Sequence, residues 1–271
     1  MTATAPAELL AVARTAAEAG ARVARRWADR LVELDVGEKA GPHDLVSRAD
    51  TEAETAVRTI LAAERPHDGV LGEEAGEQPG STGVRWVVDP IDGTTNYLYG
   101  RPDWAVSVAA TDPSGRVLAG VVVEPATGRT TWALAGGGAW AQGQRLPTLA
   151  QTDLGRALVE LNLGRPADQK PLSGRLLDAL VPHVRDVRRG GSAAVALAQV
   201  ATGRVDAAWV PGLQPWDCAA GLLLVAEAGG TVGDLHGPTP GAVPQSGDVL
   251  AAPAALWEPL RRLLGPVYGR L

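Results

Sequence analysis

An apolar stretch of this chain runs directly into two acidic residues. Residues 86–97 read WVVDPIDGTTNY, so three apolar side chains are followed by Asp89 and Asp92, with a proline between them. The apolar run is typical of a buried strand, and carboxylates at the end of such a strand are costly unless they are protonated, paired with a base or bound to a cation. The nearest basic residues, Arg85 and Arg101, lie on the far sides of the strand and of the following turn. Any fold of this chain therefore has to accommodate these two charges.

The stretch also fits a plain turn, because Asp-Pro and Asp-Gly pairs favour turns. Other acidic residues stand at predicted element ends: Glu73 and Glu74 after a short strand, and Asp50 and Asp217 at helix starts. Taken singly, the glutamates fit a solvated loop and the two aspartates fit helix caps. Taken together, these carboxylates suit a hard cation such as Mg²⁺, which prefers oxygen ligands. The four histidines are scattered and the chain has one cysteine, so no zinc site is expected.

The composition is that of a soluble globular protein. Hydrophobic residues make up 45% and charged residues 21% of the 271 residues, a length that allows one large domain or two intimate subdomains. The net charge of −6 disfavours general nucleic-acid binding, although Arg185, Arg188 and Arg189 form a local basic cluster. The single cysteine, Cys218, excludes an intrachain disulfide and fits a cytoplasmic location. Neither a signal peptide nor a membrane span is expected.

The hydrophobic periodicity predicts a chain of mixed α and β structure. Helices are expected over 6–30 and from about Asp50, with a strand over 31–36 and a polar loop over 37–49 between them. Further strands are expected over 69–72, 84–88, 104–111, 117–124, 129–135, 157–162, 205–210 and 248–252, and further helices over about 171–181, 192–202, 217–228 and 254–264.

Turn signals within 104–135 predict an antiparallel meander, because Asp-Pro-Ser-Gly and Pro-Ala-Thr-Gly separate its three strands. The segment 76–83 has the composition of a loop. The segment 136–153 is also loop-like, and it gives the expected boundary between an N-terminal α+β subdomain, 1–145, and a C-terminal α/β subdomain, 146–271.

The residues after Asp92 favour an anion site. Gly93 permits close approach of the backbone, and a short helix that begins there would point its free N–H groups at a negatively charged group. Divalent cations beside such a helix start would form a phosphate site, where the ions orient a water, lower its pKa and stabilise the leaving oxygen. The residues therefore predict chemistry on a phosphate ester.

Five motifs carry a resemblance to a known family: DLVSRAD (44–50), GEE (72–74), DPIDGTTN (89–96), GGSAA (190–194) and WDCAAG (216–221). In order and spacing, over almost the whole chain, they resemble the inositol monophosphatase family of Mg²⁺-dependent, lithium-sensitive phosphatases. The resemblance implies a layered α-β-α-β-α sandwich of the inositol monophosphatase and fructose-1,6-bisphosphatase type. It also implies a homodimer, two to three bound Mg²⁺ ions and inhibition by Li⁺.

The resemblance further implies a set of metal ligands. Glu73, Asp89 and the carbonyl of Ile91 would bind one ion. Asp89, Asp92 and Asp217 would bind a second, and Glu73 would also hold a third, weaker ion.

Catalytic and substrate contacts follow from the same resemblance. Thr94 and Asp50 would orient and deprotonate the attacking water, and Glu73 belongs to the same catalytic set. The phosphate would be held by the N–H groups of Gly93 and Thr94, and the rest of the substrate would be contacted by Asp92, Gly191, Ser192 and Ala193. Glu74 and Lys39 would support the site from outside, although Lys39 fits an ordinary surface lysine equally well.

The substrate is less constrained than the metal site. Where many family members carry a glutamate that binds ring hydroxyls, this chain has Val210. The resemblance implies a phosphoric monoester hydrolase acting on a small phosphorylated metabolite, first of all inositol 1-phosphate. Histidinol phosphate, fructose 1,6-bisphosphate and adenosine 3′,5′-bisphosphate are the alternatives, and an arginine of the 185–189 cluster facing the cleft would favour a bisphosphate. A non-catalytic regulatory member is a further alternative, but such proteins typically lose a metal ligand, and none is missing here.

Overall fold

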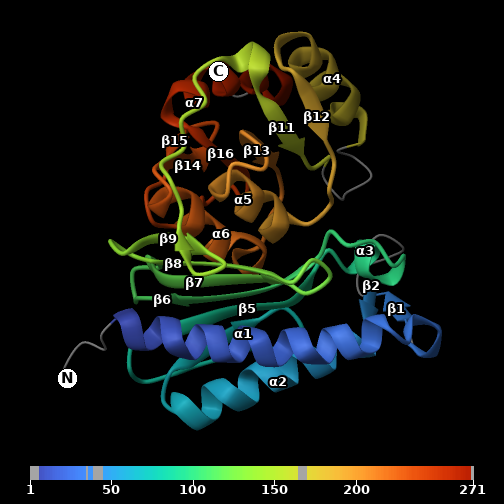
Figure 1. The fold of residues 1–271 in the computed structure, drawn as a ribbon, viewed down its shortest axis with the longest axis vertical. Coiled ribbons are helices and arrows are strands. Elements are labelled where there is room, and N and C mark those ends of the chain that lie inside the picture. Colours follow the sequence, from blue (N-terminus) through green and yellow to red (C-terminus); the bar gives the residue numbers. More distant parts are fainter. Residues whose placement is uncertain (1–5, 35, 39–44, 164–169, 270–271) are drawn as a thin grey trace.

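The computed structural model describes residues 6–34, 36–38, 45–163 and 170–269. Two sheets alternate with three layers of helices (Figure 1). From one face to the other, the layers are the pair α1 (Pro6–Ala28) and α2 (Arg48–Glu64), an eight-stranded sheet, the pair α5 (Ala193–Ala201) and α6 (Pro215–Glu227), a six-stranded sheet, and the pair α4 (Lys170–Leu180) and α7 (Ala254–Leu264). The expected α-β-α-β-α sandwich is confirmed.

The eight-stranded sheet has the order β10-β9-β8-β7-β6-β5-β3-β4. Every neighbouring pair is antiparallel except β3 and β5, which are parallel. Its strands are β3 (Gly69–Gly72), β4 (Gly76–Gln78), β5 (Arg85–Asp92), β6 (Ala105–Thr111), β7 (Val117–Glu124), β8 (Arg129–Leu134), β9 (Gly138–Ala141) and β10 (Gln144–Arg145). The run β6-β7-β8 confirms the antiparallel meander expected from the turn signals.

The six-stranded sheet has the order β12-β11-β13-β16-β14-β15, with β11 parallel to both β12 and β13 and the other pairs antiparallel. Its strands are β11 (Leu158–Leu161), β12 (Asp186–Arg188), β13 (Ala207–Val210), β14 (Gly230–Asp234), β15 (Gly237–Pro238) and β16 (Val249–Pro253). The remaining elements are the hairpin β1 (Val36–Glu38) and β2 (Leu45–Ser47), the short helix α3 (Thr94–Leu98), and 3₁₀ turns at Leu31–Glu33, Leu154–Arg156, Val181–His183 and Gly265–Tyr268.

The middle helices connect the two sheets because both of their faces are apolar. Buried side chains of α5 and α6, such as Leu197 and Leu222, share one core with Val122 of β7 and with Val249 of β16. Helix α6 approaches β7 closely at Gly120, where a Cβ atom would lie 2.9 Å from the Cα of Ala220. The division of the chain into subdomains 1–145 and 146–271 stays a prediction, since this core draws on residues from both parts.

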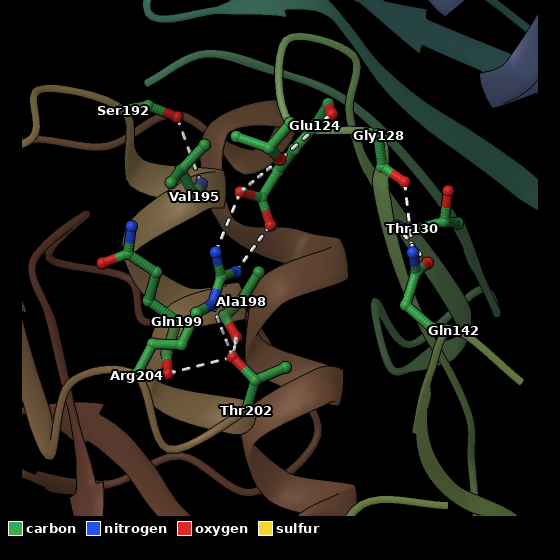
Figure 2. Close-up of polar contacts among 11 residues, drawn as sticks. Glu124, Gly128, Thr130, Gln142, Ser192, Val195, Ala198, Gln199, Thr202 and Arg204 are labelled. Carbon is green, nitrogen blue, oxygen red and sulfur yellow. Dashed lines mark hydrogen bonds and ion pairs between the residues drawn. The ribbon is translucent and has the colours of Figure 1, made fainter. Parts of the chain in front are cut away.

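A partly buried ion pair also joins the first sheet to the segment after α5 (Figure 2). Glu124, at the end of β7, accepts hydrogen bonds from Arg204 at 2.6 Å and 3.1 Å. The side chain of Glu124 is 3% exposed and that of Arg204 is 27% exposed. Removing Arg204 would leave the buried Glu124 carboxylate without its charged partner, which would destabilise this contact between the two layers.

The structure corrects several of the predicted elements. The strand over 31–36 is wrong, because Leu31–Glu33 forms a 3₁₀ turn and β1 begins only at Val36. The alternating pattern there misleads, since Val32 is 98% exposed and does not pack as a strand residue would. The loop expected over 37–49 contains part of the β1–β2 hairpin, whereas the helix expected from about Asp50 is confirmed and begins at Arg48. Lys39 lies outside the described residues.

The loop-like segments also contain short strands. Residues 76–83 contain β4, and residues 136–153 contain β9 and β10. The strands β12, β14 and β15 are likewise absent from the prediction. Strands this short are stabilised by neighbours that the local sequence does not show: Trp140 of β9, for example, stacks on Trp132 of β8 with ring centroids 5.2 Å apart. Within the described residues, no helix combines the length and the apolar character needed to cross a membrane.

Candidate active site

An irregularity at the end of strand β5 brings its two aspartates to one place. Asp89 and Asp92 are three positions apart, so in a regular strand their side chains would point to opposite faces. The register with β6 shifts between them, where Asp89 pairs with Ser107 and Asp92 with Ala105. Such a bulge re-aims a side chain, and Pro90 within it has no N–H to leave unpaired. The DPID sequence therefore turns a strand end into a pair of converging carboxylates.

The third carboxylate comes from the first turn of α6. One oxygen each from Asp89, Asp92 and Asp217 lie within 4.8 Å of one another, and all three residues are buried. Asp217 also accepts the N–H of Gln214 at 2.7 Å in a capping box. Its role as a helix cap and its place in the cluster are therefore compatible, although the sequence presents them as alternatives.

Asp89 lies at the centre of this charge cluster. It is 1% exposed, and its Oδ1 accepts the N–H of Ile91 at 3.0 Å. Its Oδ2 is buried and has no N–H or hydroxyl donor in the described part of the chain, although the Glu73 carboxyl contacts the Asp89 side chain. Burial raises the pKa of Asp89 well above its ordinary value, and the charges of Glu73, Asp92 and Asp217 raise it further.

These residues fit a divalent metal ion. A buried carboxylate oxygen without a partner, facing two more carboxylates, is stabilised when a cation takes the place of the missing donor. The available ligands are oxygens only, which suits Mg²⁺ better than zinc. Glu73 stands outside the tight group of three, but its charge still acts on Asp89.

Thr94 and Asp50 meet beside the carboxylate cluster. Asp50 is 1% exposed and lies at the third position of α2, where it accepts the Ser47 N–H at 2.9 Å and the Ser47 hydroxyl at 2.6 Å. The Thr94 hydroxyl lies 3.4 Å from Oδ1 of Asp50 and 3.1 Å from the carbonyl oxygen of Ile91. The hydroxyl has one proton and two acceptors, so it can donate to either of them.

The N-terminus of α5 is docked on Asp92. The hydroxyl of Ser192 and the N–H of Ala194, at 2.6 Å, both donate to Oδ2 of Asp92. Ser192 also caps α5 by accepting the N–H of Val195 at 3.1 Å. Ser192 and Ala193 are buried, whereas Gly191 is partly exposed. The predicted substrate segment therefore lies against the predicted metal ligand Asp92.

Gly93 is required by close packing at the start of α3. Its φ of +98° lies in the left-handed region, which side chains disfavour, and a Cβ would lie 3.0 Å from the carbonyl oxygen of Asp103 and 3.2 Å from Cβ of Ser192. The backbone at Gly93 therefore lies close to other residues of the protein, where a side chain would not fit.

Two further residues support the site, and the sequence motifs alone do not single out either of them. Glu54 of α2 is 1% exposed, and its carboxylate accepts the N–H groups of Glu74 at 2.7 Å and Ala75 at 3.1 Å. It thereby fixes the loop that carries Glu73. The spacing of Glu54 one turn after Asp50 is the only hint, because both then lie on the same face of the helix.

Asn96 is the second of these supporting residues. Its side-chain N–H₂ donates to the carbonyl oxygens of Asp103, at 2.7 Å, and Gly190, at 2.6 Å. It thus ties the helix after β5 to the segment that leads into α5. Its place in the DPIDGTTN motif is the signal that could have found it. Val210, by contrast, is fully buried in the core between α5, α6 and the sheets, so its side chain does not line the site.

Comparison with known proteins finds relatives over most of the chain. The model of the inositol monophosphatase family matches residues 5–266. An inositol-1-monophosphatase of Rhizobium meliloti is 42% identical over 224 residues, which cover 81% of this chain and 82% of that protein. The Nus factor SuhB of Pseudomonas aeruginosa is 37% identical over 237 residues, which cover 84% of this chain and 86% of that protein.

A solved structure shows the same fold. The crystal structure of the extragenic suppressor protein suhB from Bartonella henselae superposes with a TM-score of 0.88 at 34% sequence identity, and covers 94% of this chain and 98% of that one. The family match over nearly the whole chain and the identity to the rhizobial enzyme lead to one conclusion: this chain belongs to the inositol monophosphatase family.

Proposed function

We propose that the protein is a Mg²⁺-dependent phosphoric monoester hydrolase that converts inositol 1-phosphate to inositol and phosphate. The observation that carries the proposal is the buried Asp89 carboxylate, with one oxygen left without a hydrogen-bond partner among the described residues and facing Asp92 and Asp217. The name of the rhizobial relative, inositol-1-monophosphatase, supports the choice of substrate.

The proposed metal ligands are the carboxylates of Glu73, Asp89, Asp92 and Asp217 and the carbonyl of Ile91, for two to three Mg²⁺ ions. When bound, Mg²⁺ supplies charge neutralisation, an activated water and stabilisation of the leaving oxygen. Li⁺ is the expected inhibitor.

In the proposed mechanism, Thr94 and Asp50 handle the proton of the attacking water. If the Ile91 carbonyl binds a metal ion, as proposed above, Asp50 remains as the acceptor for the Thr94 hydroxyl. The Thr94 oxygen is then free to accept a hydrogen bond from a water, and the proton can pass through the hydroxyl to Asp50. The present separation of 3.4 Å is long for such a bond, as is common before substrate binds.

The phosphate of the substrate would be held by the N–H groups of Gly93 and Thr94. Asp92 and the segment Gly191, Ser192 and Ala193 would position the rest of the substrate. Gly191 is the exposed member of that segment, whereas Ser192 acts through its hydrogen bond to Asp92.

Two alternatives each have an observation in their favour. The buried Val210 removes the ring-binding glutamate of many family members, which leaves histidinol phosphate, fructose 1,6-bisphosphate and adenosine 3′,5′-bisphosphate as candidate substrates. The relative named Nus factor SuhB favours a regulatory binding role. Catalysis remains the leading proposal because every predicted metal ligand and both Thr94 and Asp50 are present.

The setting of the enzyme is part of the proposal. We propose a cytoplasmic homodimer that acts on a small phosphorylated metabolite. The chain has a single cysteine, Cys218, so it can form no intrachain disulfide, which fits a reducing compartment.

The substrate proposal is tested by phosphate release from the four candidate substrates, measured side by side with Mg²⁺ and with EDTA. We expect inositol 1-phosphate to give the highest kcat/KM and EDTA to abolish release from every substrate. Release that persists in EDTA would contradict the metal-dependent mechanism. No release from any substrate with Mg²⁺ present would favour the regulatory alternative.

Replacing Asp89 by asparagine should stabilise the metal-free protein and abolish its response to Mg²⁺. Because the pKa of Asp89 is raised in the fold, its ionisation costs stability as the pH rises from the ordinary value through the raised one. At pH near 7.5 in EDTA, Asp89→Asn should therefore increase the free energy of unfolding, measured by urea denaturation. Mg²⁺ should raise the Tm of the wild type only. A variant that is less stable in EDTA, or that is still stabilised by Mg²⁺, would contradict the assignment.

Replacing Thr94 by alanine should lower kcat while leaving Mg²⁺ affinity unchanged. The substitution removes the hydroxyl beside Asp50 but none of the proposed ligand atoms, so a fall in kcat of roughly 10²–10⁴-fold is expected. Steady-state kinetics and Mg²⁺ titration calorimetry check this. Thr95→Ala is the matched control, because Thr95 is exposed on the same short helix and should have little effect. An unchanged kcat in Thr94→Ala would remove Thr94 from the mechanism.

A further inference from the structure

Part of the second sheet is parallel, and one edge of that part leads to the carboxylate cluster. Strand β11 runs parallel to both β12 and β13, so the carboxyl ends of these strands lie along the same edge. Beyond the end of β12, the chain passes through Gly191 to Ser192, whose hydroxyl donates to Asp92. Ligands of open α/β sheets commonly bind outside the carboxyl ends of parallel strands. Residues at the ends of β11 and β13 are therefore placed to contact a substrate held at the cluster.

Asn162 is the first residue after β11. Its backbone N–H donates to the carbonyl oxygen of Trp209 at 3.0 Å, which extends the pairing with β13 and sets Asn162 beside Val210. Successive side chains of a strand point to opposite faces of the sheet. Leu161 and Trp209 pack in the core formed with α4 and α7, whereas Val210 packs in the core formed with α5 and α6. Asn162 therefore faces the α5 side of the sheet, as Val210 does.

The carboxamide of Asn162 has an unsatisfied oxygen. Its Oδ1 is buried and has no hydrogen-bond partner among the described residues, while the residue as a whole is partly exposed. A buried acceptor without a donor is unfavourable, and a ligand that brings a hydroxyl group removes that cost. Since no side-chain hydrogen bond to a described residue would be broken, a half-turn of the carboxamide can present either its oxygen or its N–H₂ group to the exposed side.

We propose that Asn162 is a specificity-determining residue that binds a hydroxyl group of the substrate, in place of the glutamate that Val210 replaces. The inference rests on the proposed phosphatase function, because it concerns the alcohol part of the same substrate. Val210 is fully buried among apolar side chains and offers no polar group. Asn162 lies next to it on the same face of the sheet and offers both a donor and an acceptor. The polar contact has thus moved from β13 to the neighbouring strand.

The chemistry of a carboxamide narrows the class of substrate. It is neutral and both donates and accepts hydrogen bonds, which matches the hydroxyl groups of a polyol. The ammonium group of histidinol phosphate would be matched better by a carboxylate. A second phosphate would require an arginine, but Arg188 pairs with Asp186 at 2.6 Å and the charge of Arg189 acts on the buried Glu160. Asn162 therefore favours a polyol monophosphate over the other candidates.

The proposal is tested by comparing two substrates that differ only in their hydroxyl groups, inositol 1-phosphate and cyclohexyl phosphate. Asn162→Ala should lower kcat/KM for inositol 1-phosphate by about tenfold, the effect of one lost hydrogen bond, and leave kcat/KM for cyclohexyl phosphate unchanged. Thr239→Val is the matched control, because the Thr239 hydroxyl is also buried without a partner among the described residues but follows β15 at the other edge of the sheet. An equal fall for both substrates, or no fall for inositol 1-phosphate, would overturn the proposal.

Thermal unfolding without substrate separates this role from a structural one. Asn162→Ala should leave the Tm unchanged, because the substitution removes no side-chain hydrogen bond to a described residue. A Tm lowered by several degrees would assign Asn162 a structural role and would contradict the proposal.

A binding measurement makes the result independent of turnover. In the Thr94→Ala background with Mg²⁺, calorimetry should show that adding Asn162→Ala weakens inositol 1-phosphate binding by about tenfold and leaves cyclohexyl phosphate binding unchanged. If the wild type releases no phosphate but this difference in binding is found, the phosphatase proposal fails and the role of Asn162 stands. If the wild type releases phosphate but Asn162→Ala binds inositol 1-phosphate as tightly as its background does, the role of Asn162 fails and the phosphatase proposal stands. No binding of inositol 1-phosphate in the Thr94→Ala background would also overturn the role of Asn162.

Discussion

The fold brings three buried carboxylates together, and most of the local structure around them serves to hold this costly arrangement. In a regular strand, the side chains of Asp89 and Asp92 would point to opposite faces. Asp217 would lie apart from them if α6 did not begin beside the end of β5. Instead the bulge in β5 and the first turn of α6 converge on one point. Burial and mutual repulsion both raise the pKa of Asp89, so the metal-free protein stores an electrostatic cost there. A bound cation converts that cost into affinity for the ion.

The cluster lies where the end of β5 meets the first turns of α5 and α6, and that position gives it contacts from both parts of the chain. Asp92 belongs to β5 but is bound by the hydroxyl of Ser192 and the N–H of Ala194 at the start of α5. Asn96 ties the same two regions together through Gly190. The segment proposed to contact the substrate is therefore fixed by a proposed metal ligand, which couples substrate position to metal binding.

The sequence points to acidic residues that the structure brings together, but it does not reveal the groups that support them. Asp89, Asp92, Asp50 and Thr94 stand in recognisable motifs, and the structure brings them together. Glu54 and Asn96 bind backbone groups that are distant in sequence, so the position of Asn96 in its motif and the spacing of Glu54 after Asp50 do not reveal their partners. The same limit applies to the fold: the long helices and the meander follow from periodicity, whereas β9 and β12 depend on neighbouring strands. Alternation alone also misassigns 31–36, because a strand needs a partner as well as a pattern.

The claim that a cation neutralises these carboxylates is tested most directly by crystals grown with Mn²⁺, which gives anomalous scattering where Mg²⁺ does not. The account predicts an anomalous peak within about 2.0–2.2 Å of carboxylate oxygens of Asp89, Asp92 and Asp217. A crystal grown with saturating Mn²⁺ that shows no anomalous peak among these three residues would contradict the claim. So would a lysine or arginine side chain at the position expected for the ion.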